Sequence, residues 1–379
     1  MVSEDRLLAF FRNIVSIDAE SYHERPMGEY IRGELEKQGL SITEDGARDS
    51  LNRRCGEPDA DASGNLFTFL PATGPGEPVL FAAHLDTVRP GRGREAVIHE
   101  DGKITSAGNT VLGADDGVAL AEILEFIHVI REEKLPHPRI EFLFASCEEP
   151  YAQGSRLFDF SPVEARDAYT LDLAGPIGTA AVAAPSILSF RIEVHGRSAH
   201  AGFAPEEGIH AISIAADAIS HIAEGHLDPE TTVNIGTIRG GEAMNIVPDF
   251  VCVTGEIRSL ADEKAMAACA SVRTAFEEAA ARQGGEVTAS CEKAFCAFSQ
   301  GEDSRTVMRF RDACRELSVP VSLVTTFGGS DNNHIAEHGI PGIVLACGYE
   351  NAHTVREYTW IEGMKQTVEI MLAIARSRS

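Results

Sequence analysis

Residues 79–88 read VLFAAHLDTV, and this stretch decides the fold. Its apolar run predicts a strand at 78–83 that is buried on both faces. The run ends at His84 and Asp86, two positions apart, so both side chains point to the same side where the strand emerges. A carboxylate that holds the second ring nitrogen of a histidine is a known partner of a metal-binding imidazole. The pair therefore indicates a metal site, although a strand-end histidine is more often a hydrogen-bonded structural residue.

Helix and strand patterns alternate on both sides of this stretch. Alternation of this kind predicts an α/β sheet with helices on both faces. We expect helices at 4–16, 25–38, 117–132, 305–317 and 361–374, and further strands at 140–145, 168–173, 320–324 and 342–346.

A different order of elements interrupts this alternation. The order is strand, helix, strand, strand, helix, strand, at 187–194, 208–223, 232–238, 249–257, 264–283 and 286–291. It predicts a small sheet with two helices on one face. We therefore expect a discontinuous α/β domain, 1–184 and 295–379, with an α+β (βαββαβ) domain inserted at 185–294.

The composition excludes several classes of function. The 33 basic and 58 acidic residues give a formal net charge of 33 − 58 = −25, which argues against nucleic acid and anionic membranes as partners. No apolar run reaches the length of a membrane span, and residues 1–20 lack the pattern of a secretory signal. The eight cysteines occur singly, so we expect reduced thiols in a cytoplasmic protein, with Cys291 and Cys296 as two packed thiols.

Histidine and acidic residues recur where predicted strands end or a helix begins. In an open α/β sheet, functional groups collect at the carboxyl ends of the strands. Each group alone has a structural interpretation, such as a helix cap or a solvated strand exit. Together at one sheet edge they would repel one another strongly without cations. The residues concerned are His84 with Asp86, Asp115 with Asp116, Glu148 with Glu149, Asp172 and His353.

The ligand types narrow the choice of metal. Imidazole and carboxylate without thiolate suit zinc, with cobalt or manganese as substitutes. Two Zn²⁺ carry +4, three ligand carboxylates leave +1, and a bridging hydroxide would make the site neutral. A pair of ions about 3.5–4 Å apart polarises an amide carbonyl and supplies a nucleophile at neutral pH. A carboxylate that is not bound to metal would move the proton. The adjacent Glu148 and Glu149 offer one carboxylate to bind metal and one to move the proton. Hydrolysis with a single metal stays open.

The motifs HLDT, GADDG, CEE, LDLAG, GGSD and NAH follow one another in this order along the chain. The ordered set resembles the di-zinc peptidase T group, which belongs to the clan of carboxypeptidase G, aminoacylase and succinyl-diaminopimelate desuccinylase. The likeness covers nearly the whole chain. It implies a zinc-peptidase-type mixed sheet flanked by helices, with an inserted lid and dimerisation domain.

The resemblance also implies a role for each residue of the cluster. Asp115 would bridge two zinc ions, Asp86 would orient His84, and Glu148 would act as the general base. The ligands of one zinc would be His84, Asp115 and Asp172, and those of the other would be Asp115, Glu149 and His353.

The inserted domain resembles the lid and dimerisation domain of that clan. His200, in GRSAHAGFAPEEG, would reach the active site of a partner subunit and stabilise the oxyanion. Asn245 and Arg258 would contact the substrate. The arginine fork of Arg258 suits a carboxylate. Gly329 and Ser330, in the GGSD loop, would approach the substrate backbone. Without the resemblance, His200 reads as a turn histidine and Arg258 as a surface residue.

Two departures from the peptidase T pattern bear on the substrate and leave the ligands intact. Gly117 stands where lysine is frequent, and Pro150-Tyr151 replaces a glycine-containing continuation.

We expect a homodimeric di-zinc aminopeptidase that acts on short peptides. A carboxypeptidase or N-acyl amino-acid deacylase of the same clan is the alternative, because those substrates also end in a carboxylate. A non-catalytic metal-binding protein is disfavoured by the joint presence of the ligands and Glu148.

Overall fold

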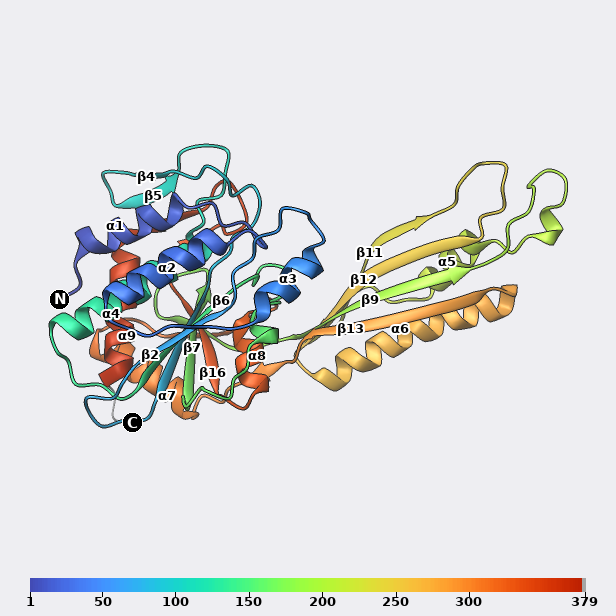
Figure 1. Ribbon diagram of the computed structural model, residues 1–379. Coiled ribbons are helices and arrows are strands. Elements are labelled where there is room, and N and C mark those ends of the chain that lie inside the picture. The colour runs from blue at the N-terminus through green and yellow to red at the C-terminus, as the bar shows by residue number, and fades with distance from the viewer. Residues whose placement is uncertain (377–379) are drawn as a thin grey trace. The chain divides into compact units, whose positions relative to one another are not determined.

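The chain forms two compact units in a computed structural model that describes residues 1–376 (Figure 1). Unit 1 comprises Met1–Ala183 and the chain from Ser299 onward, and unit 2 comprises Ala184–Phe298. Unit 2 is therefore an insertion in the sequence of unit 1. The domain limits drawn from the sequence, 185 and 294, stay a prediction.

A mixed β-sheet forms the centre of unit 1. Its strands are β1 (Thr43–Glu44), β2 (Leu66–Leu70), β3 (Val79–His84), β6 (Ile140–Ala145), β7 (Asp167–Leu173), β8 (Thr179–Ala184), β14 (Phe298–Ser299), β15 (Ser322–Thr325) and β16 (Gly342–Ala346). Within residues 1–376 these nine strands are ordered β1-β2-β6-β3-β7-β16-β8-β14, and β15 pairs with β8. β3 is parallel to β6 and β7, and β7 is parallel to β16, whereas β2 runs antiparallel to β6.

The central strand β3 is buried along its whole length. Because side chains alternate across a strand, Val79, Phe81 and Ala83 join the main hydrophobic core, and Leu80 and Ala82 join a smaller core on the other face. A strand buried on both faces needs apolar residues at every position, which explains the uninterrupted run in the sequence.

Helices cover both faces of this sheet. They are α1 (Glu4–Val15), α2 (Arg25–Lys37), α3 (Ala47–Cys55), α4 (Ala114–Glu132), α7 (Arg305–Glu316), α8 (Asp331–Glu337) and α9 (Ile361–Arg376). α1, α2, α4, α7 and α9 contribute to the main core, and α8 contributes Ile335 to the core on the opposite face. A separate small sheet contains β4 (Ala96–Ile98), β5 (Lys103–Ser106), β17 (Tyr349–Glu350) and β18 (Tyr358–Trp360). Among residues 1–376, no helix combines the length and apolarity needed to cross a bilayer.

Unit 2 is an antiparallel sheet packed against helices. Its strands are β9 (Ser186–His195), β10 (Gly225–Asp228), β11 (Thr231–Gly240), β12 (Phe250–Ser259) and β13 (Glu286–Phe295), in the order β10-β11-β12-β9-β13. Alternate residues of β9 form a core with α5 (Ala211–Ser220) and α6 (Asp262–Gln283). A mixed α/β sheet flanked by helices, with an inserted α+β unit, confirms the fold class predicted from the sequence.

Candidate metal centre

The carboxyl ends of parallel strands bring the predicted ligands of unit 1 together. His84 is the last residue of β3, and Glu148 and Glu149 follow the neighbouring β6. Asp172 lies near the end of β7, on the other side of β3. Since these strands are adjacent and parallel, their ends meet at one edge of the sheet.

Asp115 enters the cluster from the start of α4. Asp115 and Asp116 have non-helical backbone angles, their shared peptide bond is cis, and regular helix follows at Gly117. Gly113 precedes them with φ +71°, and a Cβ there would collide with the guanidinium of Arg94, so this turn requires glycine. Asp116 accepts a hydrogen bond from the backbone N–H of His84 at 3.0 Å and thereby ties the helix start to the end of β3.

His84 is fixed with one ring nitrogen facing the carboxylates. Its Nδ1 lies 2.9 Å from the backbone oxygen of Asp86 and 3.5 Å from Asp86 Oδ1. A carbonyl oxygen can only accept, so Nδ1 carries the hydrogen and Nε2 presents its lone pair in the neutral ring. Nε2 lies 3.1 Å from Asp115 Oδ1 and 3.9 Å from Asp172 Oδ1.

His353 faces the other oxygen of Asp115. Its Nε2 lies 3.3 Å from Asp115 Oδ2 and 2.9 Å from Glu149 Oε2. The His353 side chain is 56% exposed, whereas that of His84 is 1% exposed, so His353 lies at the solvent side of the cluster. The two imidazoles thus meet different oxygens of one carboxylate.

Asp86 organises the turn that carries the two glutamates. Its carboxylate accepts hydrogen bonds from the N–H groups of Glu148 at 2.8 Å and Glu149 at 3.3 Å. The hydroxyl of Ser21 donates a third, at 2.7 Å. The residue expected to orient His84 therefore also holds the Glu148–Glu149 backbone, and its nearest contact with the imidazole is through the main chain.

The histidines and Asp115 stabilise one another electrostatically. Burial opposes the charged form of His84, but hydrogen bonds to Asp115 and Asp86 raise the pKa of the imidazole well above its usual value. Burial likewise opposes ionisation of Asp115, yet the two histidines lower the pKa of this carboxyl. Hydrogen bonds to Asp115 and Glu149 raise the pKa of His353 to about 10. The anionic form of Asp115 is therefore favoured.

Burial and the neighbouring acids favour the neutral form of the remaining carboxyl groups. Burial first, and then the neighbouring Asp172, raise the pKa of Glu148 well above its usual value. Burial and the neighbouring Asp115 do the same for Asp172. Burial is also the main reason that the pKa of Glu149 is raised. Such a cluster of buried acids accepts full ionisation only beside cations.

These residues fit divalent metal ions. The ligand atoms of His84, Asp115 and Glu149 all lie within 4.8 Å of one another, as do those of His84, Glu148 and Asp172. Glu149 Oε1 is buried and has no hydrogen-bond partner among residues 1–376, which leaves an acceptor directed at no donor in that part of the chain. Mixed nitrogen and oxygen donors without sulfur suit zinc, cobalt or manganese.

The predicted residues of unit 2 fall into two places. His200 and Asn245 lie side by side, because the N–H of Ala201 donates to the Asn245 carbonyl at 3.0 Å. Arg258 lies near the far end of β12, and its Nε and Nη2 donate to the carboxylate of Glu256 at 2.6 and 3.1 Å. Unit 2 therefore groups His200 with Asn245 but not with Arg258.

In the GGSD loop, Asp331 follows Gly329 and Ser330, whose contact with the substrate stays a prediction. Ser330 is the N-cap of α8, and its hydroxyl accepts from the N–H of Asn332 at 3.3 Å, while Gly329 precedes it half-buried. Asp331 is buried, and burial raises its pKa to about 6. Its charge also helps to raise the pKa of Glu148. Asp331 stands in the quoted motif, so its acidic type was an available signal that sequence reasoning left unused.

Glu357 and Tyr349 carried no sequence signal. The Tyr349 hydroxyl donates to Asp172 Oδ1 at 3.2 Å. The buried Glu357 carboxylate accepts from the N–H groups of Gly113 at 2.7 Å and Asp115 at 2.8 Å. Burial raises the pKa of Glu357 to about 7. Both residues belong to the chain segment around His353 and connect it with other ligands.

Comparison with known proteins places this geometry in a family. The sequence matches the family described as "Peptidase dimerisation domain" over residues 182–284 and that described as "Peptidase family M28" over residues 65–178. It is 39% identical to the uncharacterized protein YqjE of Bacillus subtilis, across 99% of this chain and 98% of that protein.

Two solved structures are similar over almost their entire length. The aminopeptidase PepT of Bacillus cereus has 36% identity and a TM-score of 0.90, with 99% of this chain and 98% of that chain covered. A tripeptidase of Staphylococcus aureus has 32% identity and a TM-score of 0.92, with the same coverage. The chain therefore belongs to the M20/M28 family of metallopeptidases and is peptidase T-like within it.

Proposed function

We propose that this protein is a di-zinc aminopeptidase that releases the first residue of short peptides. The observation that carries the proposal is the placement of Asp115 between His84 and His353, with one carboxylate oxygen facing each imidazole. This is the arrangement needed for a carboxylate that bridges two ions. Asp172 beside His84, and Glu149 beside His353, would complete the two ligand sets.

Two bound zinc ions would polarise the scissile carbonyl and lower the pKa of a water molecule. Glu148 is the carboxyl group that we assign to proton transfer. It is buried beside the ligands, and burial together with Asp172 raises its pKa, which would make its carboxylate a stronger base once cations keep it ionised. Its carboxylate would take a proton from water and then give it to the leaving amine.

His200 is the residue that we assign to the oxyanion. Its Nδ1 accepts hydrogen bonds from the N–H groups of Gly202 at 3.1 Å and Phe203 at 3.2 Å. In the neutral ring the proton is consequently on Nε2, which becomes the available donor. The side chain is exposed and would therefore be available to the active site of a partner subunit.

We further propose that unit 2 forms the contact of a homodimer. The match to a peptidase dimerisation domain supports this assignment. β10 pairs with residues 231–233 of β11. In the described chain, the residues of β11 that follow, up to Gly240, have β12 as their one neighbouring strand. Most of this segment is exposed, and such an edge can pair with another chain. Sedimentation of the purified protein at micromolar concentration should give a dimer, and a monomer across the whole accessible range would contradict the assignment.

The substrate assignment can be tested with one tripeptide made of three different residues. The zinc-loaded protein should release the amino-terminal residue and the remaining dipeptide, identified by mass spectrometry. Release of the carboxyl-terminal residue would indicate a carboxypeptidase instead. The N-acetylated form of the same peptide is the matched control, and cleavage confined to that form would indicate a deacylase.

The role of Glu148 can be tested with Glu148→Gln, which keeps the shape of the side chain. We expect kcat to fall by about 10²–10⁴-fold, because general acid–base catalysis contributes about that much, while zinc content stays unchanged. Glu100→Gln changes an exposed residue of unit 1 and serves as the control. Full turnover in Glu148→Gln would refute the assigned base.

A further inference from the structure

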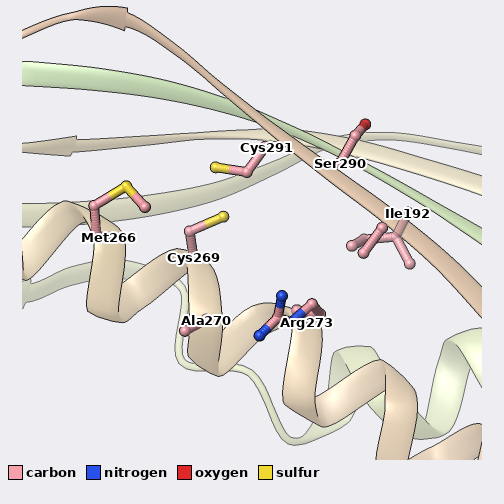
Figure 2. A pocket seen from close by; sticks show the side chains of 8 residues that line it. Ile192, Met266, Cys269, Ala270, Arg273, Ser290 and Cys291 are labelled. Carbon is pink, nitrogen blue, oxygen red and sulfur yellow. The ribbon is translucent and has the colours of Figure 1, made fainter.

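A small pocket opens in unit 2 between α6 and β13 (Figure 2). Its volume is about 180 Å³, and it is lined by Cys269, Arg273 and Met266 from α6 and by Cys291 from β13. Pockets that bury drug-sized ligands measure roughly 300–1,000 Å³. This pocket therefore has room for a small reagent only.

Two thiols meet in this pocket. Cys269 of α6 and Cys291 of β13 line the same pocket, although the two residues lie on different elements, and each thiol shifts the pKa of the other. Figure 2 shows both sulfur atoms in the space between the helix and the strand. Cys291 is exposed and Cys269 is buried, so solvent reaches one thiol and the other lies behind it. The packing of Cys291 against Cys296 stays a prediction, and the Cys296 thiol raises the pKa of Lys293.

The two thiols differ in chemistry. The neighbouring Cys269 thiol lowers the pKa of Cys291, whereas the Cys291 thiol and burial raise the pKa of Cys269, so the exposed Cys291 is the thiol that ionises first. Arg273 lies one helical turn after Cys269, and its charge favours thiolate in the pocket. The thiolate is the nucleophile in cysteine oxidation, and a neighbouring thiol can resolve the product.

We propose that Cys269 and Cys291 form a reversible redox pair that peroxide converts to a disulfide linking α6 to β13. The Cys291 thiolate attacks one oxygen of hydrogen peroxide, forms the sulfenic acid and releases hydroxide. Cys269 then attacks the Cys291 sulfur, the S–O bond breaks, and the oxygen leaves as water. Two thiols are oxidised by two electrons, and one peroxide is reduced. The pair lies in unit 2, and the proposal does not depend on the metal centre.

Peptide mapping of the full-length zinc-loaded protein tests the proposal. After removal of reductant and treatment with hydrogen peroxide, we expect a loss of two hydrogen atoms per chain and of two of the eight titratable thiols. Tryptic digestion should link peptide 265–273 to peptide 283–293, each of which contains a single cysteine. Dithiothreitol should separate them. Eight intact thiols, or a link between other cysteines, would overturn the proposal.

Single substitutions separate the two roles. In Cys269→Ser, a sulfenic acid should accumulate at Cys291 and be trapped by dimedone, whereas Cys291→Ser should show neither a link nor a trapped product at residue 269. Cys55→Ser, in unit 1, should form the link as the wild type does. In the reduced wild type, Cys291 should react with iodoacetamide faster than Cys55, and equal or slower alkylation would also contradict the assignment.

Discussion

At the scale of single residues, Glu357 has the clearest unassigned role, because one carboxylate holds the backbone on which Asp115 is presented. It accepts from Gly113 and Asp115 and belongs to the segment that carries His353. Glu357→Gln should replace one acceptor oxygen with a donor that faces a backbone N–H. We expect metal affinity to fall by about 10–100-fold, as is typical when the support of a ligand is lost. Competition with a fluorescent zinc chelator measures it.

A structural effect of Glu357→Gln can be separated from a positioning effect. The visible spectrum of the cobalt-loaded variant should change if the ligands move, whereas a general loss of stability would leave the spectrum of the folded fraction unaltered. Glu350→Gln, on β17, is the control. Wild-type affinity and an unchanged spectrum in the Glu357 variant would show that the two hydrogen bonds do not position Asp115.

At the scale of elements, α4 is buried on nearly every side. Its sequence therefore has no polar face that would show which side of the helix contacts the core. Nearly all of its residues are buried, including Glu122, which lies in an element enclosed on every side. Among the described residues, neither Glu122 side-chain oxygen has a hydrogen-bond partner. Burial raises the pKa of Glu122 well above its usual value, with a smaller opposing effect from Thr367.

This acid should make stability depend on pH. Above its ordinary pKa of 4.5 the unfolded chain loses the proton first, so unfolding becomes more favourable as pH rises toward the folded-state pKa. The slope is up to about 1.4 kcal/mol per pH unit for one proton. Glu122→Gln should therefore raise Tm relative to the wild type by an amount that grows from pH 5 to pH 8. Glu369→Gln, exposed on α9, should not, and a constant difference for Glu122→Gln would contradict the expectation.

Element boundaries were predictable where the pattern is local and long. The expected strand at 78–83 is β3 at Val79–His84, and the expected helix at 264–283 is α6 at Asp262–Gln283. The helix expected at 208–223 is shorter, at Ala211–Ser220, because His210 accepts from the N–H of Ser213 and caps it. Short strands such as β4, with three residues, offer too few positions for a periodic pattern.

At the scale of the molecule, the two units have separate hydrophobic cores, which makes metal removal a selective perturbation. Chelation should leave the buried carboxylates of unit 1 without cations and destabilise that unit. At a free-metal concentration of 1,000 Kd, binding contributes about 4 kcal/mol to the folded state. Calorimetry should show one transition move to lower temperature and return when zinc is restored.

The transition of unit 2 is the internal control for this experiment, because the cluster of ligands lies in unit 1. An equal shift of every transition would point to a general effect of the chelator. Unchanged calorimetry after complete removal of metal would contradict a stabilising metal centre.

The sequence by itself determined the order of the longer helices and strands, the insertion and the residue types of the cluster. Hydrophobic periodicity is a local property, and strand ends can be read from it. Only the tertiary structure decided which atoms meet. That Asp115 offers separate oxygens to His84 and His353, and that Glu357 supports the Asp115 backbone, depend on contacts between residues far apart in the chain. The contact between Cys269 and Cys291 likewise follows from the packing of α6 on β13, since no local pattern encodes which side chains two packed elements bring together.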